Sequence, residues 1–482
     1  MMYKSLSKDF LFFICLFFCY NIYAQKSEKP VNIVIILADD LGYGDLSCYG
    51  ATRYSTPNLD KMAMDGIRFT NFDVPQPICS ASRASILTGC YANRVGVHGA
   101  FNPHAKKGLD PSEETIAEVV KKIGYNTMAI GKWHLGHLEK YLPLQQGFDD
   151  FLGLPYSNDM VPFYYDGSRN IPEAYKRKLT YPELPLIRGD SKIKELKTLE
   201  EQSQLTTLYT ETAVQFINEN RDHPFFLYLA HSMPHVPLAV SDKFKGKSKQ
   251  GLYGDVVMEI DWSVGEILKT LKNNNLDKNT LVIFTSDNGP WLNFGNHAGS
   301  TKGLREGKGT SFEGGQRVPC IMKFPGTIPD GQVSNKLITS LDILPTIASL
   351  VNAPMPKKQI DGINMLPVLK GHEVNLRKEL YYYYANNSLE AVRYNNFKLV
   401  FPHDYRSYEG VLPGKNGLPG DYSRKTSKLT LYNLRRDPGE RYDVKDLYPS
   451  IVQKLKELAT KARKDLGDKL TGVRGANRRL EK

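Results

Sequence analysis

The chain has 482 residues, 41% of them hydrophobic, and a formal net charge of +11. This length is enough for one large core and a smaller domain, and no stretch inside the chain is long and apolar enough to span a bilayer. The positive charge favours polyanionic partners, but lysine and arginine are spread along the chain without a basic helix or a nucleic-acid motif, so we expect no nucleic-acid partner.

The first 24 residues are typical of an export signal. Lys4 and Lys8 precede an apolar run over residues 10–19, and a small-residue cleavage site ends at Ala24. A short membrane anchor is one alternative, and Cys19 also permits a lipoprotein, although no small residues precede it. We therefore expect a signal peptide over residues 1–24 and an exported protein, periplasmic or secreted, without a stable membrane span.

A continuous β-branched, apolar run over residues 31–38 predicts a strand buried on both faces, as in sheets covered by helices. It ends at Asp39 and Asp40. Two adjacent carboxylates at the end of a buried strand are costly unless a cation lies beside them, and ligands of open α/β sheets bind at this edge. An exposed Asp-Asp turn is the alternative interpretation.

The next segments lead from these aspartates to a cysteine. Thr56 and Pro57 are typical of a helix start, and residues 66–70 return as a strand, which brings Cys79 to the same sheet edge. Prolines precede Cys79 and an apolar run follows it, which predicts a helix N-terminus, where free N–H groups favour negative charge. Arg83 is one helical turn further on and can lie beside it. A buried cysteine at an ordinary helix start is the alternative.

Two further predicted strands also end in polar side chains. The strand over residues 125–130 leads to Lys132 and His134, which point to one face if the segment is extended. A solvated lysine beside a core histidine is the alternative for this pair. The strand over residues 279–286 ends at Asp287 and Asn288, the same layout as the first aspartate pair.

The two strand-end pairs together offer four hard oxygen donors without a cluster of thiolates or imidazoles. Such a set suits Ca²⁺ or Mg²⁺ rather than zinc. Two unrelated acidic turns are the alternative.

Two other segments carry candidate residues. The strand over residues 224–230 ends at His231 and His235, and a glycine-rich segment over residues 307–317 contains Lys308. Glycines allow a ligand to approach the backbone closely, but the order of residues does not fit a P-loop. We expect His231 and His297 to be structural.

Helical spacing over residues 114–123 and 259–271 predicts two further helices, and the alternation of strands and helices predicts an α/β fold. We expect a large domain over residues 25–375, with a mixed, mostly parallel sheet sandwiched by helices. Beyond it, short alternating strands and an amphipathic helix from Pro449 to Leu466 predict a smaller C-terminal domain over residues 376–482, with an antiparallel sheet and a terminal helix. Residues 158–200 form a predicted insertion near the site, and the loop over residues 98–108 offers His104 and Lys106 as candidate sugar contacts.

Three of these segments carry motifs of one family. Residues 79–83 (Cys-Ser-Ala-Ser-Arg), followed by Leu-Thr-Gly, resemble the sulfatase signature Cys-x-(Pro/Ala)-x-Arg. Residues 131–136 resemble the sulfatase motif Gly-Lys-Trp-His-Leu-Gly, which residues 151–157 continue. Residues 307–317 resemble the family's glycine-rich Gly-Lys-Gly segment. The resemblance covers most of the chain after the signal and is closest to the arylsulfatase A-like branch of the alkaline-phosphatase-like superfamily.

The resemblance implies two cofactor elements. A formylglycine-generating maturation enzyme would convert Cys79 to 3-oxoalanine (Cα-formylglycine), which hydrates to a gem-diol. One hydroxyl of the diol attacks sulfur, and the other later expels sulfate and restores the aldehyde. One Ca²⁺ would be held by Asp39, Asp40, Cys79, Asp287 and Asn288.

The resemblance also implies roles for the remaining polar residues. Arg83 and His134 would orient the diol, with His134 taking the proton during elimination, and His235 would protonate the departing sugar oxygen. The implied substrate-binding set, with the two lysines on sulfate oxygens, is Lys132, Ser157, His235 and Lys308.

These observations predict an exported, Ca²⁺-dependent sulfatase acting on a sulfated oligosaccharide of the glycosaminoglycan or mucin type, with galactose or N-acetylgalactosamine sulfate favoured by family analogy. A phosphatase or phosphodiesterase of the same superfamily is the second hypothesis, and the pair Cys79 and Arg83 argues against it. A non-catalytic glycan-binding relative is the third, and it would predict lost ligands or a replaced nucleophile.

Overall fold

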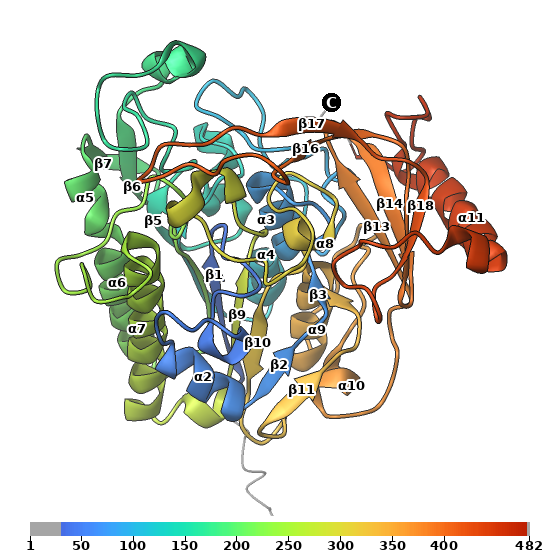
Figure 1. Ribbon diagram of the computed structural model, residues 1–482. Helices are drawn as coiled ribbons and strands as arrows, with labels where there is room; N and C mark the ends of the chain where they lie inside the picture. Colours follow the sequence, from blue (N-terminus) through green and yellow to red (C-terminus); the bar gives the residue numbers. More distant parts are fainter. Residues whose placement is uncertain (1–29, 480–482) are drawn as a thin grey trace, which may run out of the picture.

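The structure is a computed structural model that describes residues 30–479. The predicted signal peptide lies outside the described residues. The main feature is a ten-stranded mixed sheet with the order β11-β2-β10-β9-β1-β8-β4-β5-β6-β7 (Figure 1). Its strands are β1 (Asn32–Ala38), β2 (Ile67–Phe69), β4 (Asn126–Lys132), β5 (Asp150–Leu154), β6 (Leu184–Arg188), β7 (Ser191–Leu196), β8 (Phe225–Ala230), β9 (Thr280–Ser286), β10 (Cys320–Lys323) and β11 (Gln332–Ser334).

The five neighbouring strands β9, β1, β8, β4 and β5 run parallel. β10 is antiparallel to both of its neighbours, and β6 and β7 extend the other side of the sheet as an antiparallel pair. The carboxyl ends of the parallel strands therefore meet at one edge, which is where ligands of such sheets bind.

Helices cover both faces of this sheet. Along β1, Val34 and Ile36 belong to one core cluster and Ile33 and Ile35 to the other, because successive side chains of a strand alternate in direction. This alternation explains why the whole strand is apolar. The first cluster contains α2 (Pro57–Met64), α6 (Leu205–Glu219) and α7 (Leu252–Asn273), and the second contains α3 (Cys79–Thr88), α4 (Ile116–Lys121) and α9 (Ile343–Leu350).

A smaller antiparallel sheet follows in the C-terminal part, with the order β13-β14-β15-β18, and the helix α11 packs on it (Figure 1). Its elements are β13 (Glu379–Tyr384), β14 (Ser388–Tyr394), β15 (Phe397–Val400), β18 (Thr430–Asn433) and α11 (Pro449–Leu466). The remaining strands and α-helices are β3 (Phe72–Asp73), β12 (Ile338–Thr339), β16 (Asp404–Ser407), β17 (Ser423–Thr426), α5 (Leu199–Ser203), α8 (Glu313–Gln316) and α10 (Leu366–Leu369). The predicted fold class, a large mixed-sheet domain with a smaller antiparallel-sheet domain, is confirmed.

The structure differs from the predicted elements at three places. α4 begins at Ile116 rather than at residue 114, because Thr115 is its N-cap and forms a capping box with Glu118. α7 begins seven residues before the predicted start at Glu259, and its buried face already includes Val256. The segment treated as an insertion contributes β6 and β7 to the main sheet, where only part of each strand is buried, which explains the weak periodicity.

Candidate active site

The predicted site residues gather at the carboxyl edge of the parallel strands. In chain order they are Asp39 and Asp40 after β1, Cys79 and Arg83 on α3, Lys132 and His134 at the end of β4, Ser157 after β5, His235 after β8, Asp287 and Asn288 after β9, and Lys308 in the glycine-rich segment. All of them are buried. Long-range packing of the sheet thus brings together residues up to 269 positions apart.

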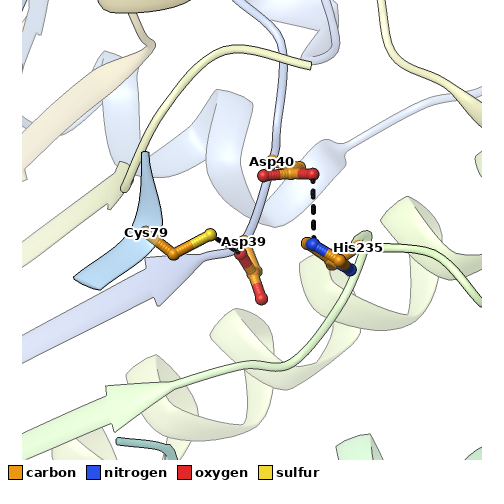
Figure 2. A group of neighbouring side chains, drawn as sticks. All are labelled: Asp39, Asp40, Cys79 and His235. Carbon is orange, nitrogen blue, oxygen red and sulfur yellow. Dashed lines mark hydrogen bonds and ion pairs between the residues drawn. The ribbon is translucent and has the colours of Figure 1, made fainter. Parts of the chain in front are cut away.

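The carboxylates and Cys79 form a compact cluster (Figure 2). Ligand atoms of Asp39, Asp40, Cys79 and His235 all lie within 4.8 Å of one another. The Cys79 thiol, drawn unmodified, lies 3.5 Å from Asp39 Oδ1. The sequence predicted His235 as a leaving-group acid rather than as a metal ligand. In the structure its Nε2 lies 3.6 Å from Asp40 Oδ2.

Asp287 and Asn288, which follow β9, contact Asp40 and complete the cluster. Asp287 Oδ1 accepts a hydrogen bond from the Asp40 backbone N–H at 3.1 Å, and Asn288 Nδ2 donates to Asp40 Oδ1 at 2.7 Å. Asn288 Oδ1 is buried without a hydrogen-bond partner among the described residues. A buried, unpaired amide oxygen beside three carboxylates fits a hard divalent cation such as Ca²⁺, which supplies the missing partner.

Three buried cations offset the carboxylates. Lys132 Nζ lies 2.5 Å from Asp39 Oδ2, Arg83 Nη2 lies 2.9 Å from Asp287 Oδ2, and Lys308 Nζ lies 2.8 Å from Asp40. Lys132 also donates to Ser157 Oγ at 3.0 Å, and Arg83 donates to the Lys132 carbonyl at 2.6 Å. These contacts fix both lysine ammonium groups and the guanidinium beside Cys79 and its aspartate neighbours.

The local backbone is strained at two of these positions. Asp40 has a φ of 64° and His134 a φ of 60°, the left-handed region that residues other than glycine rarely adopt. Such conformations cost roughly 1–3 kcal/mol and cluster at functional sites. At both positions, the direction of the side chain depends on a backbone conformation that a residue other than glycine rarely adopts.

The pKa values of Asp39 and Asp287 are shifted in opposite directions. Burial raises the pKa of Asp39, but the charges of Lys132, His235 and Arg83 outweigh this effect, so its pKa lies well below the usual value. Burial and the negative charge of Asp39 raise the pKa of Asp287. Raised and lowered pKa values in one cluster are typical of functional sites.

Burial also raises the pKa of the Cys79 thiol, against the opposing charges of Lys132 and Lys308. The thiolate is the nucleophilic form of cysteine, so an unmodified Cys79 stays protonated and is a poor nucleophile near neutral pH. A chemically altered side chain at this position would remove that obstacle.

Each of the two site histidines has one nitrogen engaged by a backbone carbonyl. His134 Nε2 lies 2.7 Å from the Phe101 carbonyl oxygen, and His235 Nδ1 lies 2.5 Å from the Val236 carbonyl oxygen. Because a carbonyl only accepts, these nitrogens carry the hydrogens, and His134 Nδ1 and His235 Nε2 can take up or release a proton. Burial lowers the pKa of both imidazoles, which keeps them neutral near pH 7.

Other residues singled out in the sequence lie away from this cluster. His231 is buried, with Nε2 3.2 Å from Ser263 Oγ. His297 is half-buried in the segment after β9. His104 and Lys106 are exposed, and His104 Nε2 lies 2.9 Å from Thr180 Oγ1 of the 158–200 segment. Among residues 30–479, no hydrogen bond or ion pair joins His104 or Lys106 to the cluster.

Sequence reasoning missed two residues that border the cluster. Asp159 lies two positions after Ser157, and the charges of His235 and Lys132 act on it. Trp291 follows the second acidic pair, and its ring centroid lies 4.9 Å from Lys308 Nζ. A signal for Trp291 existed, since it closely follows Asp287 and Asn288, whereas nothing in the sequence marked Asp159.

Comparisons with known proteins match most of the chain to one family. The sulfatase family model matches residues 31–353, and the model of the N-sulphoglucosamine sulphohydrolase C-terminal region matches residues 307–465. The N-acetylgalactosamine-6-sulfatase of Mus musculus is 37% identical over 92% of this chain and 88% of its own length. Human arylsulfatase A is 37% identical over 89% of this chain and 87% of its own.

A solved structure extends the likeness to the fold. The PsFucS1 sulfatase from Pseudoalteromonas sp. aligns with a TM-score of 0.79 and 29% identity, covering 90% of each chain. The family model covers well over half of the chain, and the two named relatives match most of its length. The chain therefore belongs to the sulfatase family and is a sulfuric ester hydrolase.

Proposed function

We propose that this protein is an exported sulfatase that removes sulfate from galactose or N-acetylgalactosamine residues of glycosaminoglycan or mucin-type glycans. In this proposal Cys79 is converted to formylglycine, and one Ca²⁺ binds at the carboxylate cluster. The observation that carries it is the unpaired Asn288 Oδ1 beside the carboxylates of Asp39, Asp40 and Asp287, next to a buried Cys79.

The cofactor elements would supply what the native side chains lack. The hydrated aldehyde at position 79 would provide a nucleophile that can later expel sulfate, and Ca²⁺ would neutralise the sulfate oxygens and acidify that nucleophile. The ligands for the cation would be the oxygens of Asp39, Asp40, Asp287 and Asn288, with residue 79 as a further ligand.

The residues of the chain would then bind, orient and transfer protons. Lys132 and Lys308 would hold sulfate oxygens, with a further hydrogen bond from Ser157. Arg83 would orient residue 79. His134 Nδ1 would accept the proton from residue 79 when sulfate is expelled, since its other nitrogen is engaged by a carbonyl.

The leaving group requires an acid, because a sugar alkoxide is a poor leaving group. We assign this role to His235, whose Nδ1 contacts the Val236 carbonyl and leaves Nε2 to carry the transferable proton. Burial and the charge of Lys308 lower the pKa of this imidazole, and the nearby charge of Asp40 only partly opposes them, so the protonated form is the minor one near pH 7. Protonated His235 would give its proton to the departing oxygen.

The choice of substrate rests on the relatives. Several of the most similar proteins, from mouse, rat, dog and human, are named N-acetylgalactosamine-6-sulfatases at 37–38% identity. We therefore place 6-sulfated galactose and N-acetylgalactosamine first among the candidate substrates. Export of the chain is part of the proposal and depends on the signal-like sequence of residues 1–24. Among residues 30–479, no helix has the length and apolar character to cross a membrane.

Two measurements test the proposal. The Cys79 peptide, isolated from a host that contains the maturation enzyme, is expected to be lighter by the mass difference between a thiol and an aldehyde. The purified protein is expected to release sulfate from 6-sulfated galactose or N-acetylgalactosamine in the presence of Ca²⁺, and not phosphate from the matching phosphates. An unmodified thiol from such a host, or preferential phosphate release, would contradict the proposal.

A further inference from the structure

A carboxylate that has no role in the chemistry above borders the active-site cluster. Asp159 follows β5 in the same turn as Ser157, whose hydroxyl is held by Lys132. Unlike the fully buried Ser157, the Asp159 side chain is only partly buried. Tyr165 donates to Asp159 Oδ2 at 3.4 Å, and the ammonium group of Lys178 donates to the Asp159 carbonyl. The carboxylate is thus fixed at the boundary between the cluster and solvent.

This carboxylate is ionised although its side chain is partly buried. Burial raises the pKa of Asp159, but the charges of His235, Lys178 and Lys132 and a hydrogen bond from Ser157 bring the pKa below its usual value. An ionised carboxylate offers about four acceptor positions, of which Tyr165 and Ser157 use two. The other positions can accept hydrogen bonds from a substrate, because the side chain is partly exposed.

An indole borders the same region. The ring centroid of Trp291 lies 5.8 Å from that of His235 and 6.3 Å from that of Tyr165. The Trp291 side chain is partly exposed, while its neighbour Phe294, at 4.9 Å, is buried. Tyr165 therefore contacts both Trp291 and Asp159, and these groups surround the side of the site where His235 lies.

The charge of Asp159 shows which part of a substrate it can bind. A carboxylate repels a sulfate group, so it is suited to the alcohol side of the ester rather than to sulfur. A sugar offers hydroxyl donors there, whereas a phenol offers none. The apolar C–H face of a pyranose can pack against an indole, and small-molecule sites typically combine such aromatic walls with a few placed polar groups.

We propose that Asp159 and Trp291 form the subsite for the sugar ring of the leaving group, Asp159 accepting a hydrogen bond from a hydroxyl near the sulfated carbon and Trp291 packing against the ring. This inference rests on the proposed function and adds to it the residues that select a sugar ester over an aryl ester. Asp159 and Trp291 are specificity-determining residues in this proposal, while His235 remains the proton donor.

The Asp159→Asn variant tests the hydroxyl contact. A hydrogen bond to a charged acceptor contributes about ten- to hundredfold in binding, so kcat/KM for galactose 6-sulfate is expected to fall at least tenfold further than kcat/KM for p-nitrophenyl sulfate. The excess loss is expected to vanish for the one monodeoxy galactose 6-sulfate that lacks the bonded hydroxyl. Equal losses on both ester classes, or the same loss on every deoxy analogue, would overturn the proposal.

Asp166→Asn is the matched control, because Asp166 is exposed on the same segment and undergoes the same chemical change. Its ratio of sugar to aryl activity is expected to equal that of the wild type. A wild-type enzyme that releases sulfate from no sugar ester would refute the proposed function itself. An active wild type whose Asp159→Asn variant keeps the same substrate ratio would refute only the subsite.

The Trp291→Ala variant tests the ring contact, with Trp291→Phe as the variant that keeps a flat apolar surface. We expect KM for galactose 6-sulfate to rise about tenfold in the alanine variant and less in the phenylalanine variant. Because Lys308 also lies over the indole, inhibition by inorganic sulfate is measured in parallel. If sulfate inhibition weakens as much as KM rises, Trp291 acts by positioning Lys308, and its assignment to the sugar subsite is wrong.

Discussion

A buried lysine joins the two domains, and its removal gives the sharpest test of how the fold is held together. Lys398 on β15 has its Nζ 3.0 Å from a carboxylate oxygen of Glu313 and 3.0 Å from one of Glu440, and all three side chains are fully buried. Glu440 also accepts from the backbone N–H of Glu313 at 2.7 Å. Glu313 opens α8 within the glycine-rich segment over residues 307–317 that also carries Lys308.

We expect Lys398→Met to lower the free energy of unfolding by about 3 kcal/mol. Removing one partner of a buried ion pair costs roughly 3–5 kcal/mol, because the remaining charge stays buried without compensation. The lower end applies here because Arg317 keeps its own contact with Glu313. For the described residues 30–479, about 450 in number, the unfolding entropy is on the order of 1 kcal/mol per kelvin, so the melting temperature should fall by about 3 °C.

The assay is urea unfolding followed by tryptophan fluorescence, with calorimetry alongside. Lys461→Met is the matched control, since Lys461 forms an exposed ion pair with Glu379 at 3.1 Å, which contributes less than about 1 kcal/mol. Adding Glu440→Gln to Lys398→Met should restore at least about 1 kcal/mol by removing one uncompensated carboxylate. If Lys398→Met costs no more than Lys461→Met, the interpretation of this bridge is wrong.

Three further predictions concern the site and its surroundings. Calcium at about 100 times its Kd should stabilise the wild type by about 2.7 kcal/mol in thermal unfolding. This stabilisation should disappear in Asn288→Ala but persist in Asn296→Ala, a control at an exposed position. If Asn288→Ala keeps the stabilisation, Asn288 is not a calcium ligand. His235→Ala should lower kcat/KM for a sugar sulfate by about 10²–10⁴-fold and that for p-nitrophenyl sulfate far less, because a nitrophenolate leaves without protonation; equal losses would exclude the acid role. Burial raises the pKa of Glu390 from 4.5 to about 8, so the unfolded carboxyl ionises first and the fold loses stability as pH rises from about 4.5 to 8, by up to a few kcal/mol. Glu390→Gln should flatten this part of the pH dependence in urea titrations at pH 5 and pH 8, and an unchanged slope would contradict it.

Local patterns predicted the parts of the structure that depend on neighbouring residues. The run over residues 31–38 is apolar at every position because both of its faces are covered, and this alone identifies β1 as a central strand. The rule that parallel strands share a carboxyl edge then brought Asp40 and Asn288 together in the prediction, and their side chains lie 2.7 Å apart. Cys79 likewise begins α3, as its flanking prolines and apolar run predicted.

Contacts between distant segments were beyond the reach of these patterns. The carbonyl that orients His134 belongs to Phe101, 33 residues earlier, in a loop without regular structure. Lys398 resembles any strand lysine in the sequence, and only the docking of the two domains places it between Glu313 and Glu440. Asp159 lacks a motif because its environment is built from β5, β8 and the 158–200 segment together. Packing between segments far apart in the sequence determines the surroundings of His134, Lys398 and Asp159, and local sequence patterns do not reveal it.

The charge balance of the active site explains how three carboxylates can be buried together. Each would cost several kcal/mol if it stood alone. Arg83, Lys132 and Lys308 lie against Asp287, Asp39 and Asp40, respectively, and offset this cost. Under the proposed function, Ca²⁺ would be held by the same three carboxylates, and the two lysine ammonium groups would hold the anionic ester. The residues that offset the buried carboxylates would then also bind sulfate, which would explain why both lysines lie directly against the proposed metal ligands.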